Sequence, residues 1–179
     1  MRKTTHPTSE EFAPFYADYI QRAEARRDVI AALPLQIDEI QAALGKLSDV
    51  QSRFKPEPDE WSIREVIGHL IDVERVFSYR LLRVSRNDPT PLPGFDQEDY
   101  VREAGFDKYP LDELLDEFKY LRRANIIAIR NMPESYSDRR GTASGFPVSV
   151  RALIHMLIGH VDHHMASLNE KYLPTAITL

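Results

Sequence analysis

Cysteine is absent from this chain of 179 residues, and glycine occurs only seven times. Without cysteine, the protein has no disulfide bond, no thiolate-bound zinc and no cysteine nucleophile. So few glycines leave no glycine-rich loop to hold a phosphate, and the G-x-S-x-G nucleophile motif does not occur. These absences exclude enzymes with a cysteine nucleophile, enzymes with a phosphate-binding glycine loop, and hydrolases with the G-x-S-x-G motif.

Long apolar runs are missing as well. No stretch approaches the roughly 18 apolar residues that a membrane-spanning helix needs. The opening residues, MRKTTHP, lead into no hydrophobic signal core. We therefore expect a cytoplasmic protein that has no membrane partner.

Positive charge is the minority charge: 23 Lys and Arg residues stand against 28 Asp and Glu residues, for a net charge of −5. Proteins that bind nucleic acid usually carry a basic face. We therefore expect a small-molecule substrate and no nucleic-acid partner. The length suits one domain covering residues 1–179.

What the chain does contain is helical periodicity, because apolar residues recur at helical spacing while alternating strand patterns are scarce. A short opening helix is predicted after Thr8, which precedes two acidic residues and an aromatic stripe. A break is predicted at Leu33–Pro34, since proline fits poorly inside a helix, and Pro174 is predicted to stop the last helix. The long helical segments are predicted at residues 26–48 (with that break), 62–86, 110–131 and 149–172.

Two long connections separate these segments. Residues 87–108 begin with the proline-rich run NDPTPLPG and are predicted to form a long crossover that contains a short helix at 97–103. Residues 141–147 are predicted to be an irregular loop. The expected fold is all-α: a four-helix bundle with long crossover loops and a short N-terminal helix.

Three histidines form the strongest functional signal. His160 and His164 are four residues apart, so a helix places both on one face. His69 lies in another segment, between the apolar positions Val66 and Val73. A lone histidine on an apolar face is usually a packed core residue. However, three buried imidazoles without a metal would each need hydrogen-bond partners to offset their desolvation. We therefore predict that His69, His160 and His164 bind one divalent ion, with a coordination position left open.

The sequence allows more than one role for each of the polar residues near these histidines. His163 could be a fourth ligand, a group that supports the ligands, or a residue at the rim of the site, and the last two readings are preferred. His155 should point to a different face of its helix and pack or lie partly exposed. Asp72 could orient an imidazole, or it could pair with Arg75 or Arg151. Nitrogen ligands suit zinc, nickel or ferrous iron, as well as copper.

The ordered motifs of the chain resemble those of the DinB-like superfamily, in its DinB_2 branch. The resemblance covers about residues 16–173, and the motifs are Trp61-Ser62-x-x-Glu65-x-x-x-His69-Leu70, Glu74-Arg75 followed by Arg80, Pro93-Gly94-Phe95-Asp96, and Gly159-His160-x-x-His163-His164.

This resemblance implies an up-down-down-up bundle with a divalent metal held by three histidines near one end, matching His69, His160 and His164. It also implies a fold similar to that of bacillithiol- and mycothiol-dependent S-transferases, and a homodimer formed through bundle helices. Relatives often carry glutamine shortly after the last histidine, whereas this chain has Ser167-Leu168-Asn169. Substrate-side chemistry therefore does not transfer.

Two functional hypotheses follow. The first is a metal-dependent enzyme of thiol S-transferase or hydrolase type, in which the ion activates the low-molecular-weight thiol of a cofactor or a water molecule. Its pocket would lie between the second and fourth bundle helices. The candidate walls are Trp61 and the loop from Pro93 to Tyr100, in particular Phe95 and Tyr100. The second is a non-catalytic, metal-stabilised module that binds a ligand or partner in a stress response.

Overall fold

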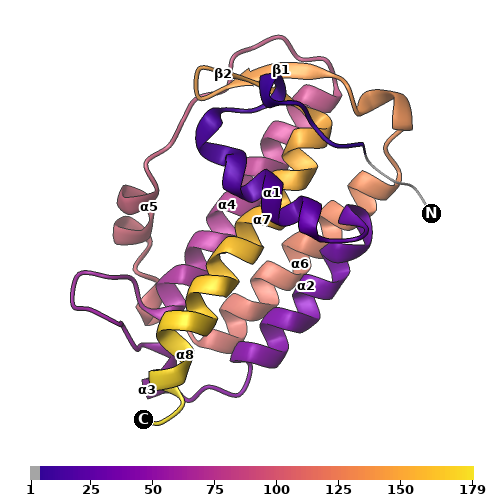
Figure 1. The fold of residues 1–179 in the computed structure, drawn as a ribbon. Helices are drawn as coiled ribbons and strands as arrows, with labels where there is room; N and C mark the ends of the chain where they lie inside the picture. Colours follow the sequence, from indigo (N-terminus) through magenta and orange to yellow (C-terminus); the bar gives the residue numbers. More distant parts are fainter. Residues whose placement is uncertain (1–4) are drawn as a thin grey trace.

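Four long helices packed side by side form the body of the computed structural model, which describes residues 5–179 (Figure 1). α2 (Val29–Leu44) and α7 (Val150–Ser167) run in one direction, whereas α4 (Ile63–Ser85) and α6 (Leu111–Arg130) run in the opposite direction. α4 packs against both α6 and α7, and α2 does the same from the other corner. This up-down-down-up arrangement confirms the predicted four-helix bundle.

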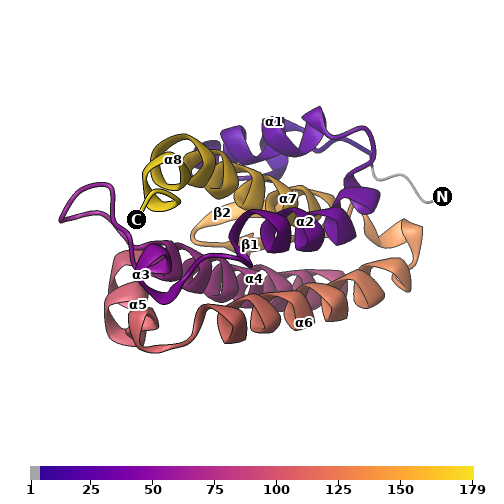
Figure 2. The same cartoon turned by 90° about the horizontal axis from the view of Figure 1, so that it is seen from below.

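Shorter elements cover the bundle and connect its helices. α1 packs along α7, while α5 lies in the long crossover that carries the chain from the end of α4 to the start of α6 (Figures 1 and 2). 3-10 turns lie at Ser9–Glu11, Pro14–Tyr16, Phe106–Lys108 and Glu134–Tyr136. The other short elements are α1 (Ala17–Ala25), α3 (Asp49–Ser52), α5 (Gln97–Ala104), β1 (Arg140–Ala143), β2 (Phe146–Ser149), a π-helical turn (Leu168–Tyr172) and α8 (Leu173–Ala176).

A capping box fixes the start of α4. The Ser62 side chain accepts a hydrogen bond from the backbone N–H of Glu65, and the Glu65 carboxylate accepts one from the backbone N–H of Ser62. Two otherwise unpaired donors of the first turn are thereby satisfied. The cap places His69 in the second turn of α4.

Pro34 does not break its helix, so that prediction was wrong. It lies inside α2, where it is exposed to solvent. Its missing N–H removes one backbone hydrogen bond, at a cost of about 3 kcal/mol. Leu33 and Ile37 on either side of the proline are buried in the core. Their burial offsets that cost.

Residues 141–147 are not an irregular loop. They belong to an antiparallel hairpin in which Ala143 faces Phe146, with Ser144 and Gly145 both in left-handed backbone conformations (φ 52° and 82°). Such a two-residue turn matches the twist of paired strands. The crossover joins this hairpin through hydrogen bonds between Leu92 and the backbones of Thr142 and Ser144. Strands of four residues are too short to show a clear alternation.

The opening helical segment and the end of the last helical segment also differ from the prediction. The opening segment is two 3-10 turns followed by α1, since Pro14 interrupts a continuous helix. At the other end, Pro174 does not terminate the helical path but lies in α8. A π-helical turn precedes it, with the N–H of Leu173 bonded to the carbonyl of Leu168, and this wider turn accommodates the proline.

Two apolar clusters fill the bundle, one formed largely by the α2 start, the α4 end and the α7 start, the other by the opposite ends of these helices. A buried polar network lies between them. The Arg122 guanidinium on α6 donates to the Glu74 carboxylate (2.8 Å), the Gln36 side-chain oxygen (2.7 Å) and the Leu157 carbonyl (2.9 Å). We call Arg122, Glu74 and Gln36 the central network. It joins all four bundle helices.

No helix within residues 5–179 is both long enough and apolar enough to cross a membrane.

Gly159 sets how closely α1 approaches α7. A Cβ atom at this position would lie 1.8 Å from the backbone carbonyl oxygen of Tyr19. We expect Gly159→Ala to lower the free energy of unfolding by about 1–3 kcal/mol, because α1 must shift away from α7. Urea denaturation measures the change. Gly94→Ala is the control, since its Cβ would meet only Ser144 at ordinary contact distances. Equal stability of the two variants would contradict this account.

Candidate metal centre

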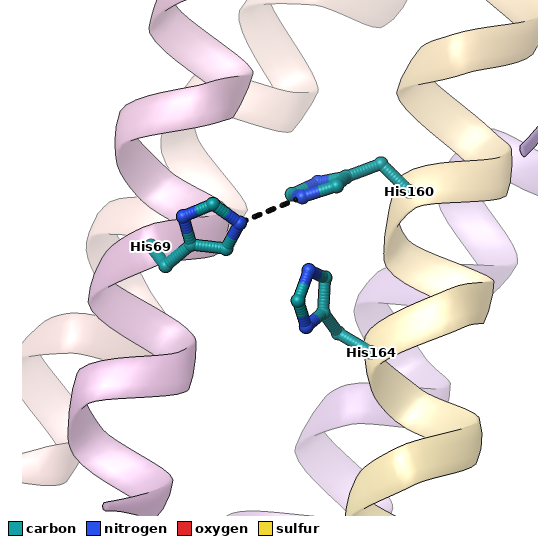
Figure 3. Close-up of side chains that lie close together, drawn as sticks. All are labelled: His69, His160 and His164. Carbon is teal, nitrogen blue, oxygen red and sulfur yellow. Dashed lines mark hydrogen bonds between the residues drawn. The ribbon is translucent and has the colours of Figure 1, made fainter. Parts of the chain in front are cut away.

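The three histidines predicted as ligands come together between α4 and α7 (Figure 3). The Nε2 atoms of His69 and His160 are 2.9 Å apart. His164, one turn further along α7, presents its ring to the same space, with ring centroids 4.6 Å from His160 and 4.8 Å from His69. One ligand nitrogen from each residue lies within 4.8 Å of the other two. The i, i+4 spacing places His160 and His164 on one face of α7. The packing of α4 against α7 brings His69 beside them.

Burial keeps these imidazoles neutral. Desolvation, reinforced by His163, lowers the pKa of His69 to about 4. Desolvation and the neighbouring His69 and His163 lower the pKa of His164 to about 3. The pKa of His160 is also held well below its usual value, first by burial and then by the surrounding histidines. At neutral pH each ring therefore offers a free lone pair to a cation.

This donor set fits a divalent transition ion. Zinc binds imidazole nitrogen at about 2.0–2.1 Å, so two nitrogens on one ion are at most about 4.2 Å apart. The three nitrogens here are within 4.8 Å of one another. A small rotation of one ring brings them all within reach of one ion. Three nitrogen ligands leave room for a further ligand, as in zinc sites that act on substrates.

Aromatic side chains hold two of the rings in place. Trp61 packs on His69 with ring centroids 4.8 Å apart, and its indole N–H donates to Glu98 on α5 (3.1 Å). Tyr19 on α1 packs edge-on against His160 at 5.3 Å. These contacts restrict how far His69 and His160 can rotate.

A cavity of about 320 Å³ opens beside His164. Trp61 lines it, as the sequence predicted. Phe95 and Tyr100 are not among the described residues that line it; their rings pack against each other at 5.2 Å instead. The walls are mixed in character, with acidic, aromatic, hydroxyl and cationic side chains: Asp59, Glu60, Trp61, Val66, Gln97, Glu98, His163, Ser167, Leu168, Lys171 and Tyr172.

Several of these wall residues were not predicted from the sequence. Lys171 could have been found, because it is seven residues after His164 and so continues the same helical face. Gln97 and Glu98 lie in the predicted wall segment 93–100, whereas nothing in the local sequence of Glu60 indicates this cavity. Burial, together with Glu60, raises the pKa of Tyr172 to about 12, so its hydroxyl remains protonated.

His163 lies at the rim of the site. Its Nδ1 donates to the Asp18 carboxylate of α1 (2.9 Å), and its side chain is 41% exposed. It lines the cavity but does not belong to the cluster of three. This placement agrees with the preferred reading of a rim or supporting residue.

Asp72 and His155 do not belong to the cluster of three rings. Among the described residues no hydrogen bond joins Asp72 to a histidine; burial raises the pKa of its carboxyl, and the positive charge of Arg75 opposes that rise. Arg151 pairs with Glu11 instead. His155 is fully buried on another face of α7.

Comparison with known proteins agrees with this fold. A protein of Geobacillus thermodenitrificans named "Putative metal-dependent hydrolase" is 24% identical over 171 residues, which cover 92% of this chain and 94% of that protein. YfiT from Bacillus subtilis, described as a probable metal-dependent hydrolase with an unusual four-helix bundle topology, superposes with a TM-score of 0.71 at 15% identity. The superposition covers 89% of this chain and 91% of YfiT.

The family model described as "DinB superfamily" matches residues 32–168. This range contains α4, α6 and α7 in full, α2 from Ala32 onward, and the three clustered histidines. The chain belongs to the DinB superfamily.

Proposed function

We propose that this protein is a metal-dependent hydrolase in which His69, His160 and His164 hold one divalent ion: zinc, nickel or ferrous iron. The observation that carries the proposal is the convergence of three neutral imidazoles, two buried and one half-buried, at the edge of a cavity of about 320 Å³. Similarity to two proteins described as metal-dependent hydrolases supports the same reaction class. A cavity of this size suits a small-molecule substrate.

A divalent ion bound by these rings would supply Lewis-acid chemistry, either polarising a carbonyl or lowering the pKa of a water or thiol. The chain itself supplies position. Trp61 and Tyr19 restrain two of the ligand rings, which keeps the donors aimed at one point. Lys171 and the acidic side chains of Glu60 and Glu98 line the space that a polar substrate would enter.

His163 is placed to move a proton at the cavity. Its Nδ1–H is bonded to Asp18, so in the neutral ring Nε2 carries the lone pair. A histidine oriented by a carboxylate is a common general base. The ring of His163 is 5.0 Å from that of His164, centroid to centroid. We assign it the role of accepting a proton from the attacking nucleophile.

Metal binding should depend on the three clustered rings. We expect His69→Ala and His164→Ala each to weaken zinc or nickel affinity by at least about 100-fold, because a directly bound ligand is lost. Equilibrium dialysis of untagged protein followed by elemental analysis measures this. His163→Ala is the control and should keep about one tightly bound ion per chain. The ligand assignment is wrong if His69→Ala keeps its ion and His163→Ala loses it.

Activity assays should distinguish a hydrolase from a thiol S-transferase and from a non-catalytic module. We expect metal-loaded protein to hydrolyse members of a panel of small esters and amides, and a chelator to abolish the activity. His163→Ala should retain the ion but lose roughly 10²- to 10⁴-fold in kcat. A second arm mixes small thiols with electrophiles, since a chain without cysteine needs an external thiol for S-transfer. Turnover only in that arm identifies a thiol S-transferase, and turnover in neither identifies a non-catalytic binding module.

We also propose that the protein is a homodimer formed through the outer face of α4 and α6. Four large apolar side chains on these neighbouring helices are at least half exposed: Tyr79, Leu82, Tyr120 and Ile127. Burial in a twofold interface would remove them from water.

Light scattering at micromolar concentration should therefore report twice the mass of one chain. Tyr120→Glu should shift the protein towards the monomer, because the interface would bury an unpaired charge. Val50→Glu, at an exposed apolar position on α3, is the control and should leave the mass unchanged. A monomeric wild-type protein would contradict the proposed interface.

A further inference from the structure

His155 carries an unsatisfied nitrogen in a fully buried position. Its Nδ1 lies 2.8 Å from the backbone carbonyl oxygen of Arg151, one turn earlier on α7. A carbonyl only accepts hydrogen bonds, so Nδ1 carries the hydrogen and Nε2 carries a lone pair. Within residues 5–179, Nε2 is shielded from solvent and has no hydrogen-bond partner. An unsatisfied buried acceptor destabilises the folded state, so a ligand bound to this lone pair would be favourable.

A second imidazole stands next to it. The His6 ring is 6.1 Å from the His155 ring, centroid to centroid. His6 Nδ1 lies 3.0 Å from a carboxylate oxygen of Glu24 on α1. This proximity favours a proton on Nδ1, which in the neutral ring leaves the lone pair on Nε2. Both rings therefore have a similar arrangement: Nδ1 lies beside an oxygen acceptor, and Nε2 is available to a ligand.

This arrangement is typical of metal-ligating histidines, whose second N–H is usually held by a carboxylate or a backbone carbonyl. Zinc–nitrogen bonds of about 2.0–2.1 Å allow the centroids of two imidazole rings on one ion to be at most roughly 6.4 Å apart. If the N–metal–N angle is bent, the two ring centroids must be about 1 Å closer than the observed 6.1 Å. The side chain of His6 is 70% exposed and is free to make that movement.

We propose that His6 and His155 form a second binding site for a divalent transition ion, separate from the cluster of His69, His160 and His164. The two Nε2 atoms are the ligands, Glu24 and the Arg151 carbonyl orient the rings, and water fills the remaining positions. Zinc, nickel, cobalt and copper suit such nitrogen ligands. With two protein ligands, this site binds more weakly than the three-histidine cluster. The ion fastens the N-terminal segment, from His6 onward, to α1 and α7.

The test is a zinc titration of untagged protein, followed by calorimetry and equilibrium dialysis. Wild-type protein should bind a second, weaker ion per chain after the first. The second ion should persist in His160→Ala, which damages only the three-histidine cluster. It should be lost in His6→Gln and His155→Gln. Glu24→Gln should weaken it by roughly 10- to 100-fold, as expected for a residue that orients a ligand.

His163→Gln is the matched control, because His163 is also an exposed histidine paired with a carboxylate on α1. It should keep the second ion. Excess zinc should raise the melting temperature of His160→Ala but not that of His160→Ala combined with His6→Gln. The proposal is overturned if wild-type protein binds only one ion, or if His6→Gln, an exposed substitution that leaves the core intact, binds the second ion as wild type does.

Discussion

The buried charge of Arg122 is the constraint on which the rest of the bundle depends. A guanidinium fully enclosed by helices is costly unless its partners are in place, and removing one partner from such a pair typically costs about 3–5 kcal/mol. Glu74 on α4, Gln36 on α2 and the Leu157 carbonyl on α7 supply them. Sliding any one helix along its neighbours would break at least one of these buried hydrogen bonds. The central network therefore fixes the axial register of all four helices. It also fixes the level at which His69 on α4 meets His160 on α7.

The same dry interior prepares the metal centre chemically. Burial lowers the pKa of the clustered imidazoles because water no longer stabilises their charged forms, and the rings disfavour one another's protonation. Three adjacent neutral rings cannot satisfy one another with hydrogen bonds alone, as the single contact between His69 and His160 illustrates. A cation bound by all three rings would supply the partner that their nitrogens lack. The cavity reaches the cluster at His164, and His163 lies at its rim, where it is bonded to Asp18.

α7 contributes residues both to the metal centre and to the contact with α1. One face presents His160 and His164 to α4, while another carries the close contact between Gly159 and α1 and the buried ring of His155. α1 in turn supplies residues to both regions, since Tyr19 packs on His160 and Glu24 holds His6. The packing of one short helix on α7 thus links the metal centre to the N-terminal segment.

The sequence alone determined the helices, the bundle and the three clustered histidines, because these depend on local periodicity, on a capping box at Ser62 and on an i, i+4 spacing that survives in any helix. The prediction of a break at Pro34 was wrong because core burial outweighs the backbone penalty of the proline. The hairpin at Ser144–Gly145 was missed because four-residue strands are too short to show a clear alternation. Only the tertiary structure decided which side chains line the cavity and which nitrogen of His155 is left without a partner. Those features depend on contacts between segments far apart in the chain, and neither periodicity nor composition encodes such contacts.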